Sequence, residues 1–478
     1  MPLRAKILEP RAARAQMSTS PVRTIPKELD TDEPHDVLFN NLYGLRTIEL
    51  NRPAKLNSLN GSMIRKIFPR LVEWEKSDMT NVVVMKGAGE KAFCAGGDVN
   101  ALAIQNKQGP EGQKQSVDYF AQEYQLDHYI ATYKKPYIAF MDGITMGGGV
   151  GLSIHAPFRI ATERTVFAMP ETKIGFFPDV GASFFLPRMA GSVGTYLALT
   201  SERLTGANVF YSGIATHYLH STSLPNLESR LAELRFRDYD SMDDRLAIIE
   251  MTIEEYATGL PPGESILLGG QLRKAIDRCF SKHSVADIIA ALKEEQDPTK
   301  EWAEKTLDTL HERSPTAVHV ALRAMRVGHQ WTIAETFQRE HQMAARFMKH
   351  PDFVEGVTAL LISKENPKPK PKWQPATLED IEPGSNIAEP FFRLTGGPSK
   401  LTLVTDEDYS EYPYQSFGVP TESDVEMLVK EGGWTRREIQ KEFVKRKRGR
   451  QGISTIVDEI LARKTIINDD GKAEWVDE

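Results

Sequence analysis

Cysteine is almost absent from this chain of 478 residues, which has only Cys94 and Cys279. Two cysteines are too few for a disulfide framework, so we expect a reducing compartment rather than secretion. The sequence also has no H-E-x-x-H motif and no paired C-x-x-C motif. It therefore predicts neither a structural nor a catalytic metal site.

Long apolar runs and excess positive charge are lacking too. The nearest candidate for a membrane span, Pro136 to Phe158, contains Asp142, five glycines and two prolines, and we expect no span there. A formal net charge of −7 excludes a general nucleic-acid binder. With 40% hydrophobic and 26% charged residues, the composition is that of an ordinary globular protein.

Three common catalytic and nucleotide-binding motifs are missing as well. "GLSIH" and "GASFF" lack the second glycine of the G-x-S-x-G nucleophile turn. "GITMGGGVG" does not spell the dinucleotide-binding G-x-G-x-x-G, and it lacks the Lys-Ser/Thr pair of a phosphate loop. Serine hydrolase chemistry and the binding of dinucleotides or ATP are therefore disfavoured.

The N-terminal segment 1–35 is rich in arginine and poor in acids. Its first 23 residues contain four arginines and one lysine against the single acid Glu9, without a long apolar stretch. This composition is typical of a mitochondrial presequence, and we expect a mitochondrial matrix protein. The alternative is a disordered basic leader without a targeting role, and Met17 is a possible internal start.

The rest of the chain divides into four parts by residue pattern and composition. Residues 36–234 alternate strand-like runs such as "GLRTIELNR" and "NVVVMKG" with helical patterns, which indicates an α/β core. Residues 235–363 read as amphipathic helices, and 364–384 form a Pro/Lys linker. Residues 385–478 read as a helical extension, in which Thr435 to Arg450 holds eight basic residues and two acids.

Two glycine-bearing turns, 93–99 ("FCAGGDV") and 143–151 ("GITMGGGVG"), each follow a strand-like run and precede a helix-like run. Glycine lets a ligand approach the main chain, and the first turn of a helix has unpaired N–H groups. Two such N–H groups from separate turns can stabilise the oxyanion that develops when a thioester carbonyl is attacked. The alternative is that these glycines only permit tight strand-to-helix packing.

Two acids, Glu171 and Asp179, stand in the apolar stretch "MPETKIGFFPDVGAS". Apolar neighbours such as Phe176, Phe177 and Phe184 would exclude water and raise the proton affinity of both carboxyl groups. Acids in such surroundings are candidates for catalysis. The alternatives are that Glu171 caps a helix or pairs with a lysine, and that Asp179 is a turn residue.

Several motifs together resemble the crotonase, or enoyl-CoA hydratase/isomerase, superfamily. They are "NRPAKLNSL", "KAFCAGGDV", "GITMGGGVGLS" and "FAMPETKIGFFPDVGASFFLPR", of which the last resembles the 3-hydroxyisobutyryl-CoA hydrolase branch. The resemblance covers roughly residues 36–380. It implies an α/β fold, a crotonase-like spiral of ββα units followed by a mainly helical C-terminal block and then, in this chain, a basic helical extension.

The resemblance also implies a site and a reaction. The main-chain N–H groups of Gly97 and Gly148 would form the oxyanion hole for a short 3-hydroxyacyl-CoA thioester, most simply 3-hydroxyisobutyryl-CoA, with 3-hydroxypropionyl-CoA a close rival. Glu171 would act as nucleophile or as base on water, and Asp179 would bind the substrate's 3-hydroxyl group. Glu123 would complete the polar wall. No cofactor is implied, because coenzyme A is part of the substrate.

Two other functions stay open. Hydratases of the superfamily use a further glutamate at the place of Gly151. The glycine therefore makes a hydratase or isomerase function less favoured. In some fungi, members of this hydrolase family are similar to, or are, proteins of the mitochondrial small ribosomal subunit. The extension beyond residue 385 favours that partner, because a basic helix can neutralise RNA phosphates. The alternative is that the basic run is a solvated face, as charge runs more often are. An oligomer is a further expectation.

Overall fold

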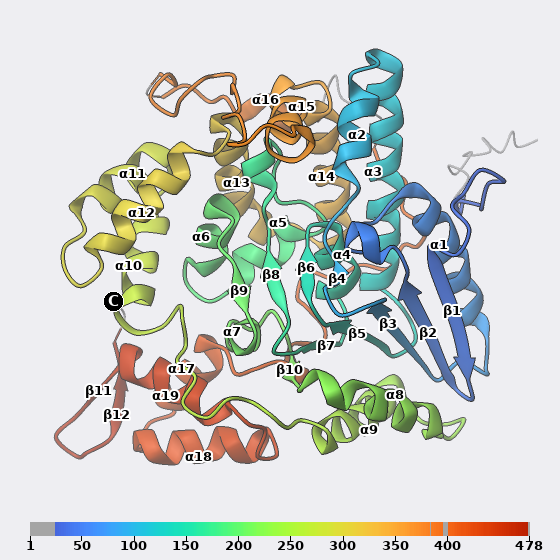
Figure 1. The fold of residues 1–478 in the computed structure, drawn as a ribbon. Helices are drawn as coiled ribbons and strands as arrows, with labels where there is room; N and C mark the ends of the chain where they lie inside the picture. Colours follow the sequence, from blue (N-terminus) through green and yellow to red (C-terminus); the bar gives the residue numbers. More distant parts are fainter. Residues whose placement is uncertain (1–23, 383, 395–399, 477–478) are drawn as a thin grey trace, which may run out of the picture.

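Two β-sheets form the centre of the molecule (Figure 1). The computed structural model describes residues 24–382, 384–394 and 400–476, so most of the predicted leader lies outside the described residues. The larger sheet has the strand order β1-β2-β3-β5-β7-β10, parallel except for β1 against β2. Its strands are β1 (Val37–Leu42), β2 (Leu45–Leu50), β3 (Val82–Gly87), β5 (Tyr137–Met141), β7 (Phe158–Ala161) and β10 (His217–Tyr218).

The smaller sheet has the order β4-β6-β8-β9, with β4, β6 and β8 parallel and β9 antiparallel. Its strands are β4 (Ala92–Cys94), β6 (Ile144–Met146), β8 (Val166–Ala168) and β9 (Leu204–Thr205). The chain alternates between the sheets, because β3, β5 and β7 are followed by β4, β6 and β8 and then by helices. This alternation is the expected spiral of ββα units, and the predicted α/β fold class is confirmed.

Of the helices that accompany these strands, α1 (Gly61–Lys76) forms where the apolar spacing predicts it. The core helices are α1 (Gly61–Lys76), α2 (Val99–Asn106), α3 (Pro110–Ala131), α4 (Gly148–Ile154), α5 (Ala182–Phe185), α6 (Val193–Thr200), α7 (Ala207–Tyr211), α8 (Leu224–Glu233) and α9 (Met242–Glu255). In α1, Met63, Ile67, Leu71 and Trp74 are buried on one face. The Asn60 side chain accepts a hydrogen bond from Met63 N at 2.8 Å, which caps the helix.

A helical block follows, as its amphipathic pattern predicts. It consists of α10 (Gly270–Phe280), α11 (Val285–Glu294), α12 (Lys300–His311), α13 (Pro315–Val327), α14 (Ile333–Phe347) and α15 (Pro351–Val357). Helix α14 packs along α3, and α13 packs against α6. The block therefore completes the hydrophobic core around the smaller sheet. Among the helices that the structure describes, none has the length and apolarity to cross a membrane.

After the Pro/Lys segment and a short helix, α16 (Glu389–Phe392), residues 400–420 run across the core. We call residues 400–420 the strap. Gln125 Nε2 donates to Thr402 O at 2.7 Å, and Ile333 N, at the start of α14, donates to Tyr409 O at 2.9 Å. The Tyr412 hydroxyl donates to Ala156 O at 2.6 Å. The strap thus ties α3, α14 and the end of α4 together.

The C-terminal extension contains α17 (Glu422–Lys430), α18 (Arg436–Arg446) and α19 (Ile453–Lys464), as its pattern predicts. It also contains an antiparallel hairpin of β11 (Thr465–Ile467) and β12 (Ala473–Trp475), which the expectation of a purely helical extension missed. The signal was present, because Asp-Gly between two alternating runs is a hairpin turn sequence. Helix α19 packs against α10, so the extension is joined to the helical block.

Arg450 anchors the extension to the core. Its buried side chain pairs with Glu250 at 2.7 Å and also with Glu254, both on α9. It also donates to the carbonyls of Phe417 at 2.8 Å and Thr216 at 3.1 Å. A buried cation with this many partners fixes the turn after α18 in one position.

We predict that Arg450→Met lowers the free energy of unfolding by about 3–5 kcal/mol, because two carboxylates lose their buried partner. Urea denaturation of the full chain measures this change. Arg448→Met is the matched control, since Arg448 is exposed two positions earlier. Equal stabilities of the two variants would contradict the anchoring role.

Candidate functional site

The two glycine turns meet in space. Gly97 follows β4 and precedes α2, whereas Gly148 follows β6 and begins α4. A Cβ atom at Gly148 would lie only 3.3 Å from Gly97 N, and one at Gly147 would lie 3.4 Å from Gly96 Cα. Gly147 has φ +44°, a conformation that residues with a Cβ rarely adopt. The structure therefore brings together the two main-chain positions from which the sequence predicts an oxyanion hole.

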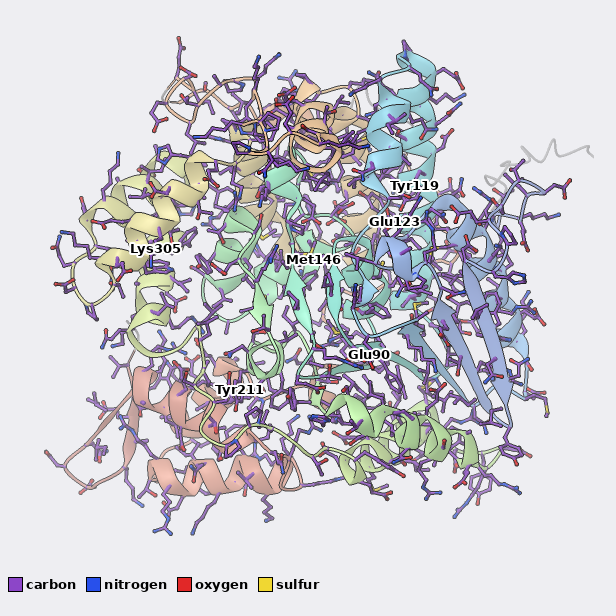
Figure 2. All side chains as sticks on the ribbon, in the orientation of Figure 1. Glu90, Tyr119, Glu123, Met146, Tyr211 and Lys305 are labelled. Atoms are coloured by element: carbon purple, nitrogen blue, oxygen red, sulfur yellow. The ribbon has the colours of Figure 1, made fainter. Side chains whose placement is uncertain are left out.

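Two of the predicted acids point at this glycine corner. A Cβ atom at Gly148 would lie 2.5 Å from Glu123 Oε1, and one at Gly147 would lie 3.0 Å from Glu171 Oε1. Glu123 comes from α3, further along the helix than Tyr119 (Figure 2). Glu171 comes from the turn after β8. The glycines leave room for carboxyl groups that any side chain would displace.

The predicted acids are buried. Glu171 is 5% exposed, and its Oε2 atom has no hydrogen-bond partner among the described residues. Asp179 is also 5% exposed, and Tyr124, next to Glu123 on α3, donates its hydroxyl to Asp179 Oδ2 at 2.6 Å. Glu171 starts a short 3-10 turn, Glu171–Ile174, but its side chain forms no cap and no ion pair with Lys173. The structure therefore shows neither of the two alternatives for Glu171, a helix cap or an ion pair with a lysine.

Two further buried acids, Asp127 and Glu340, belong to the same cluster and were not predicted. Both are fully buried, and both oxygens of the Asp127 carboxyl lack a partner among the described residues. Asp127 lies one helical turn after Glu123 on α3, so an acid recurring at i and i+4 was the signal. Glu340 lies on α14, far away in sequence, and nothing local indicated it.

Asp127 takes up the space beside position 151. A Cβ atom at Gly151 would lie 2.5 Å from Asp127 Oδ2 and 2.8 Å from Val180 Cβ. No larger side chain fits at position 151 without displacing the Asp127 carboxyl. The space that a side chain at position 151 would need is thus occupied by a carboxyl group from α3. The spacing of residues in the sequence could not reveal this.

Glu340 holds the turn that carries Asp179. Its carboxyl group accepts hydrogen bonds from Gly181 N at 2.7 Å and Ser183 N at 2.9 Å. Between them and Asp179 lies Val180, whose φ of +55° is strained for a β-branched residue. The imidazole Nε2 of His155 also contacts Val180 O at 3.2 Å. These contacts offset the strain and fix where Asp179 points.

Burial changes the proton affinity of every acid in the cluster. It raises the pKa values of Glu171, Glu123 and Asp127 well above their usual range, and repulsion by neighbouring carboxylates raises them further. Burial also raises the pKa of Asp179 to about 7, against the hydrogen bond from Tyr124. The pKa of Glu340 rises to about 8, opposed by its two N–H donors. Burial therefore favours the protonated form of each of these acids.

Aromatic rings close the site on the apolar side. The rings of Phe176 and Phe177 lie 4.8 Å apart between centroids, and Phe176 stacks on Phe120 of α3 at 5.2 Å. Phe184, which we expected in the same wall, packs instead against Tyr409 of the strap at 5.4 Å and under the Arg188 guanidinium. The reason is that the strained turn at Val180 directs the chain away from the acids.

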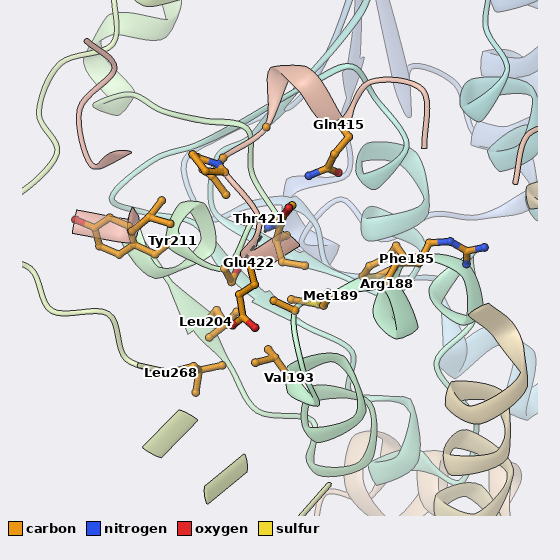
Figure 3. Close-up of a pocket in the computed structure, with 18 of the residues that line it drawn as sticks. Phe185, Arg188, Met189, Val193, Leu204, Tyr211, Leu268, Gln415, Thr421 and Glu422 are labelled. Carbon is orange, nitrogen blue, oxygen red and sulfur yellow. Dashed lines mark hydrogen bonds between the residues drawn. The ribbon is translucent and has the colours of Figure 1, made fainter. Parts of the chain in front are cut away.

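Two cavities flank the site. One, of about 280 Å³, is lined by residues of α2 and α3 together with Asn60, Asp98 and Tyr119, and lies next to Gly97. A Cβ atom at Gly97 would be 3.1 Å from the Tyr119 hydroxyl, so this cavity reaches the glycine corner. The other, of about 180 Å³, lies between the core and the extension, where Leu204 and Leu268 face Glu422 (Figure 3).

Comparison with known proteins agrees with this geometry. The family model described as enoyl-CoA hydratase/isomerase matches residues 45–392. Small ribosomal subunit protein mS47 of Neurospora crassa is 60% identical over 471 residues, 98% of this chain and 92% of that protein. The mitochondrial 3-hydroxyisobutyryl-CoA hydrolase of Gallus gallus is 43% identical over 351 residues, 73% of this chain and 87% of that protein.

A solved structure gives the same result for the fold. The crystal structure of a carnitinyl-CoA dehydratase from Mycobacterium thermoresistibile is 34% identical and superposes with a TM-score of 0.66. The match covers 78% of this chain and 100% of that one. With its interleaved sheets and the two glycine turns at their edge, this chain belongs to the enoyl-CoA hydratase/isomerase family.

Proposed function

We propose that this chain is a protein of the mitochondrial small ribosomal subunit, built on an acyl-CoA hydrolase fold. The observation that carries the proposal is coverage: the ribosomal relative matches 98% of the chain, whereas the hydrolase relative matches 73%. The family model ends at residue 392, so the strap and the extension lie beyond it. What the chain adds to the family fold is therefore what it shares with a ribosomal protein.

The compartment follows from two independent features. The hydrolase relative is mitochondrial by its name, and the Arg-rich, acid-poor leader is typical of a matrix-targeting presequence. A chain in the matrix meets both mitochondrial ribosomes and acyl-CoA esters. Both proposed activities are thus available in one place.

A second function, hydrolysis of a short 3-hydroxyacyl-CoA thioester, is favoured by the site. The N–H groups of Gly97 and Gly148 would donate hydrogen bonds to the carbonyl oxygen as it becomes negative. Glu171 would attack the carbonyl carbon, giving a mixed anhydride and releasing coenzyme A as a thiolate that takes a proton from water. Water would then hydrolyse the anhydride, which frees the 3-hydroxy acid and restores Glu171. In the alternative, Glu171 would take a proton from the water molecule that attacks the thioester directly. Asp179 would bind the 3-hydroxyl group, and Glu123 would border the carbonyl. The substrate most compatible with the relatives is 3-hydroxyisobutyryl-CoA.

The ionisation of the cluster sets a condition on this chemistry. Glu171 can act as nucleophile or base only as the carboxylate, yet its burial favours the protonated form. A cluster of five buried acids cannot lose all its protons at once, because each charge raises the cost of the next. Hydrolysis would therefore accelerate as the pH rises through the apparent pKa of the cluster.

The ribosomal proposal predicts that the full chain, tagged and expressed in mitochondria, sediments with the small subunit in a sucrose gradient at physiological ionic strength. Immunoblotting measures the tagged chain in each gradient fraction, and the small-subunit RNA is measured in the same fractions. A matrix enzyme of similar size is the control for trapping. Recovery of the tagged chain only among free proteins would refute the proposal.

The hydrolase proposal predicts that purified chain releases free thiol from 3-hydroxyisobutyryl-CoA, and that Glu171→Gln lowers kcat by about 10²–10⁴-fold. A thiol reagent follows the release continuously. Glu90→Gln is the matched control, because Glu90 is 85% exposed in its side chain. If the wild-type chain is active and Glu171→Gln keeps that activity, Glu171 is not the catalytic group.

Asp179 gives a prediction that does not depend on turnover. Its pKa of about 7 in the folded chain exceeds its ordinary value of 3.8, so folding binds its proton more tightly. Asp179 should therefore lower the wild-type free energy of unfolding as pH rises from about 4 to about 7, by about 1.4 kcal/mol per unit of its pKa shift at most. Asp179→Asn cannot ionise and should lack this contribution, whereas the other buried acids keep theirs.

Urea denaturation at pH 4.5, 6.0 and 7.5 tests the difference between the two proteins. Its expected sign is that Asp179→Asn gains stability relative to wild type at each higher pH. Asp118→Asn, on the exposed face of α3, serves as control and should follow wild type. A constant difference between Asp179→Asn and wild type would show that Asp179 is ionised throughout this range.

A further inference from the structure

The basic run between Thr435 and Arg450 splits into two sets. Four of its eight cations are used inside the molecule. Arg436 donates to Thr465 Oγ1 at 2.8 Å, and Arg446 pairs with Glu442 at 2.9 Å. Lys447 donates to Gly418 O at 2.6 Å, and Arg450 pairs with the α9 carboxylates. Arg436, Lys447 and Arg450 hold the extension in place, whereas the exposed Arg446 pair lies within α18.

The other four cations, Arg437, Lys441, Lys445 and Arg448, are exposed. None of them has an ion pair or a side-chain hydrogen bond with another described residue. Arg437, Lys441 and Lys445 stand at positions i, i+4 and i+8 of α18, opposite the buried Ile439 and Phe443. We call these four residues the basic face.

The position of the basic face leaves it open to a partner. Helix α18 lies along the outer edge of the molecule, with α17 and α19 between it and the core (Figure 1). The rigid contacts of Arg450 and Lys447 fix the end of α18 against the strap and α9. Arg437, Lys441 and Lys445 are therefore presented as a row on a supported helix, and Arg448 lies in the turn directly after it.

The row of charges works against the helix that carries it. Like charges at i and i+4 destabilise a helix by about 0.2–0.5 kcal/mol per pair, and α18 has two such pairs here. The extension is not basic as a whole, since residues 385–478 hold 14 lysines and arginines against 18 aspartates and glutamates. Positive charge is thus concentrated on one face although the surrounding segment is acidic, which is the charge distribution of a polyanion-binding surface.

We propose that the basic face docks on the phosphate backbone of the small-subunit ribosomal RNA. This inference rests on the proposed ribosomal function and names the surface that carries it. Phosphates spaced along a strand match a row of cations, and contact with them replaces the repulsion along α18 by attraction. The contacts are to the backbone, so the face positions the chain on RNA without reading sequence.

The test compares two quadruple variants of the full chain. In the first, Arg437, Lys441, Lys445 and Arg448 are all changed to Gln. The control changes Lys76, Lys282, Lys300 and Lys349 to Gln, four exposed lysines elsewhere, so both variants lose the same charge. Binding to deproteinised mitochondrial small-subunit RNA is titrated at several salt concentrations, and binding to isolated small subunits stripped of this chain is measured by sedimentation.

The basic-face variant should bind this RNA at least about tenfold more weakly near physiological salt, with the slope of log K against log salt smaller by about 3. It should also fail to rebind stripped subunits, and its Tm should not fall, because repulsion along α18 is removed. The control variant should keep the wild-type slope. Equal slopes for the two variants would overturn the proposal.

The remaining outcomes are also decisive. If the basic-face variant fails to rebind stripped subunits but binds deproteinised RNA as the control variant does, the partner of this face is a ribosomal protein. The RNA proposal is then wrong. If the wild-type chain binds neither subunits nor RNA, the ribosomal function itself fails. If the wild-type chain and both variants all rebind subunits equally, only the docking surface proposed here is refuted.

Discussion

The burial of five carboxyl groups around two glycine turns is the constraint on which the rest of the structure depends. Removing a carboxyl from water favours its protonated form, and each neighbour of like charge adds to this. The fold tolerates Glu123, Asp127 and Glu171 there only because helices and sheets on every side hold them. The arrangement costs stability, and buried acids with shifted pKa values are typical of a functional site.

The strap, which follows the end of the family match at residue 392, contacts elements that hold this site. The strap holds the N-terminus of α14 through Tyr409, and α14 carries Glu340, which fixes the turn of Asp179. The strap also covers Phe184 through Tyr409. An extension shared with a ribosomal protein is thereby coupled mechanically to an enzyme-like centre.

The sequence predicts what depends on local residues. The α/β architecture follows from strand and helix periods, whereas the spiral of ββα units follows from the resemblance to the crotonase superfamily. The glycine turns and Glu171 follow from the motifs that carry this resemblance. The roles of Gly97, Gly148, Glu123, Glu171 and Asp179 stay predictions. Glu340 could not be foreseen, because its partners are main-chain N–H groups 159 and 157 positions away. Asp127 carried a signal only in hindsight, as an acid one turn from Glu123 on a buried face.

The run "KRKRGR" shows most directly why charge composition does not predict function. Arg448 and Arg450 are two residues apart, yet Arg448 faces solvent, whereas Arg450 is buried between two acids of α9. The turn at the end of α18 decides this, since Arg448 has φ +53° and reverses the chain direction. A count of cations would assign all eight to RNA or none. Only the fold separates the cations that have acceptors within the chain from the four exposed ones that remain for a partner, and for Arg450 those acceptors are the acids on α9.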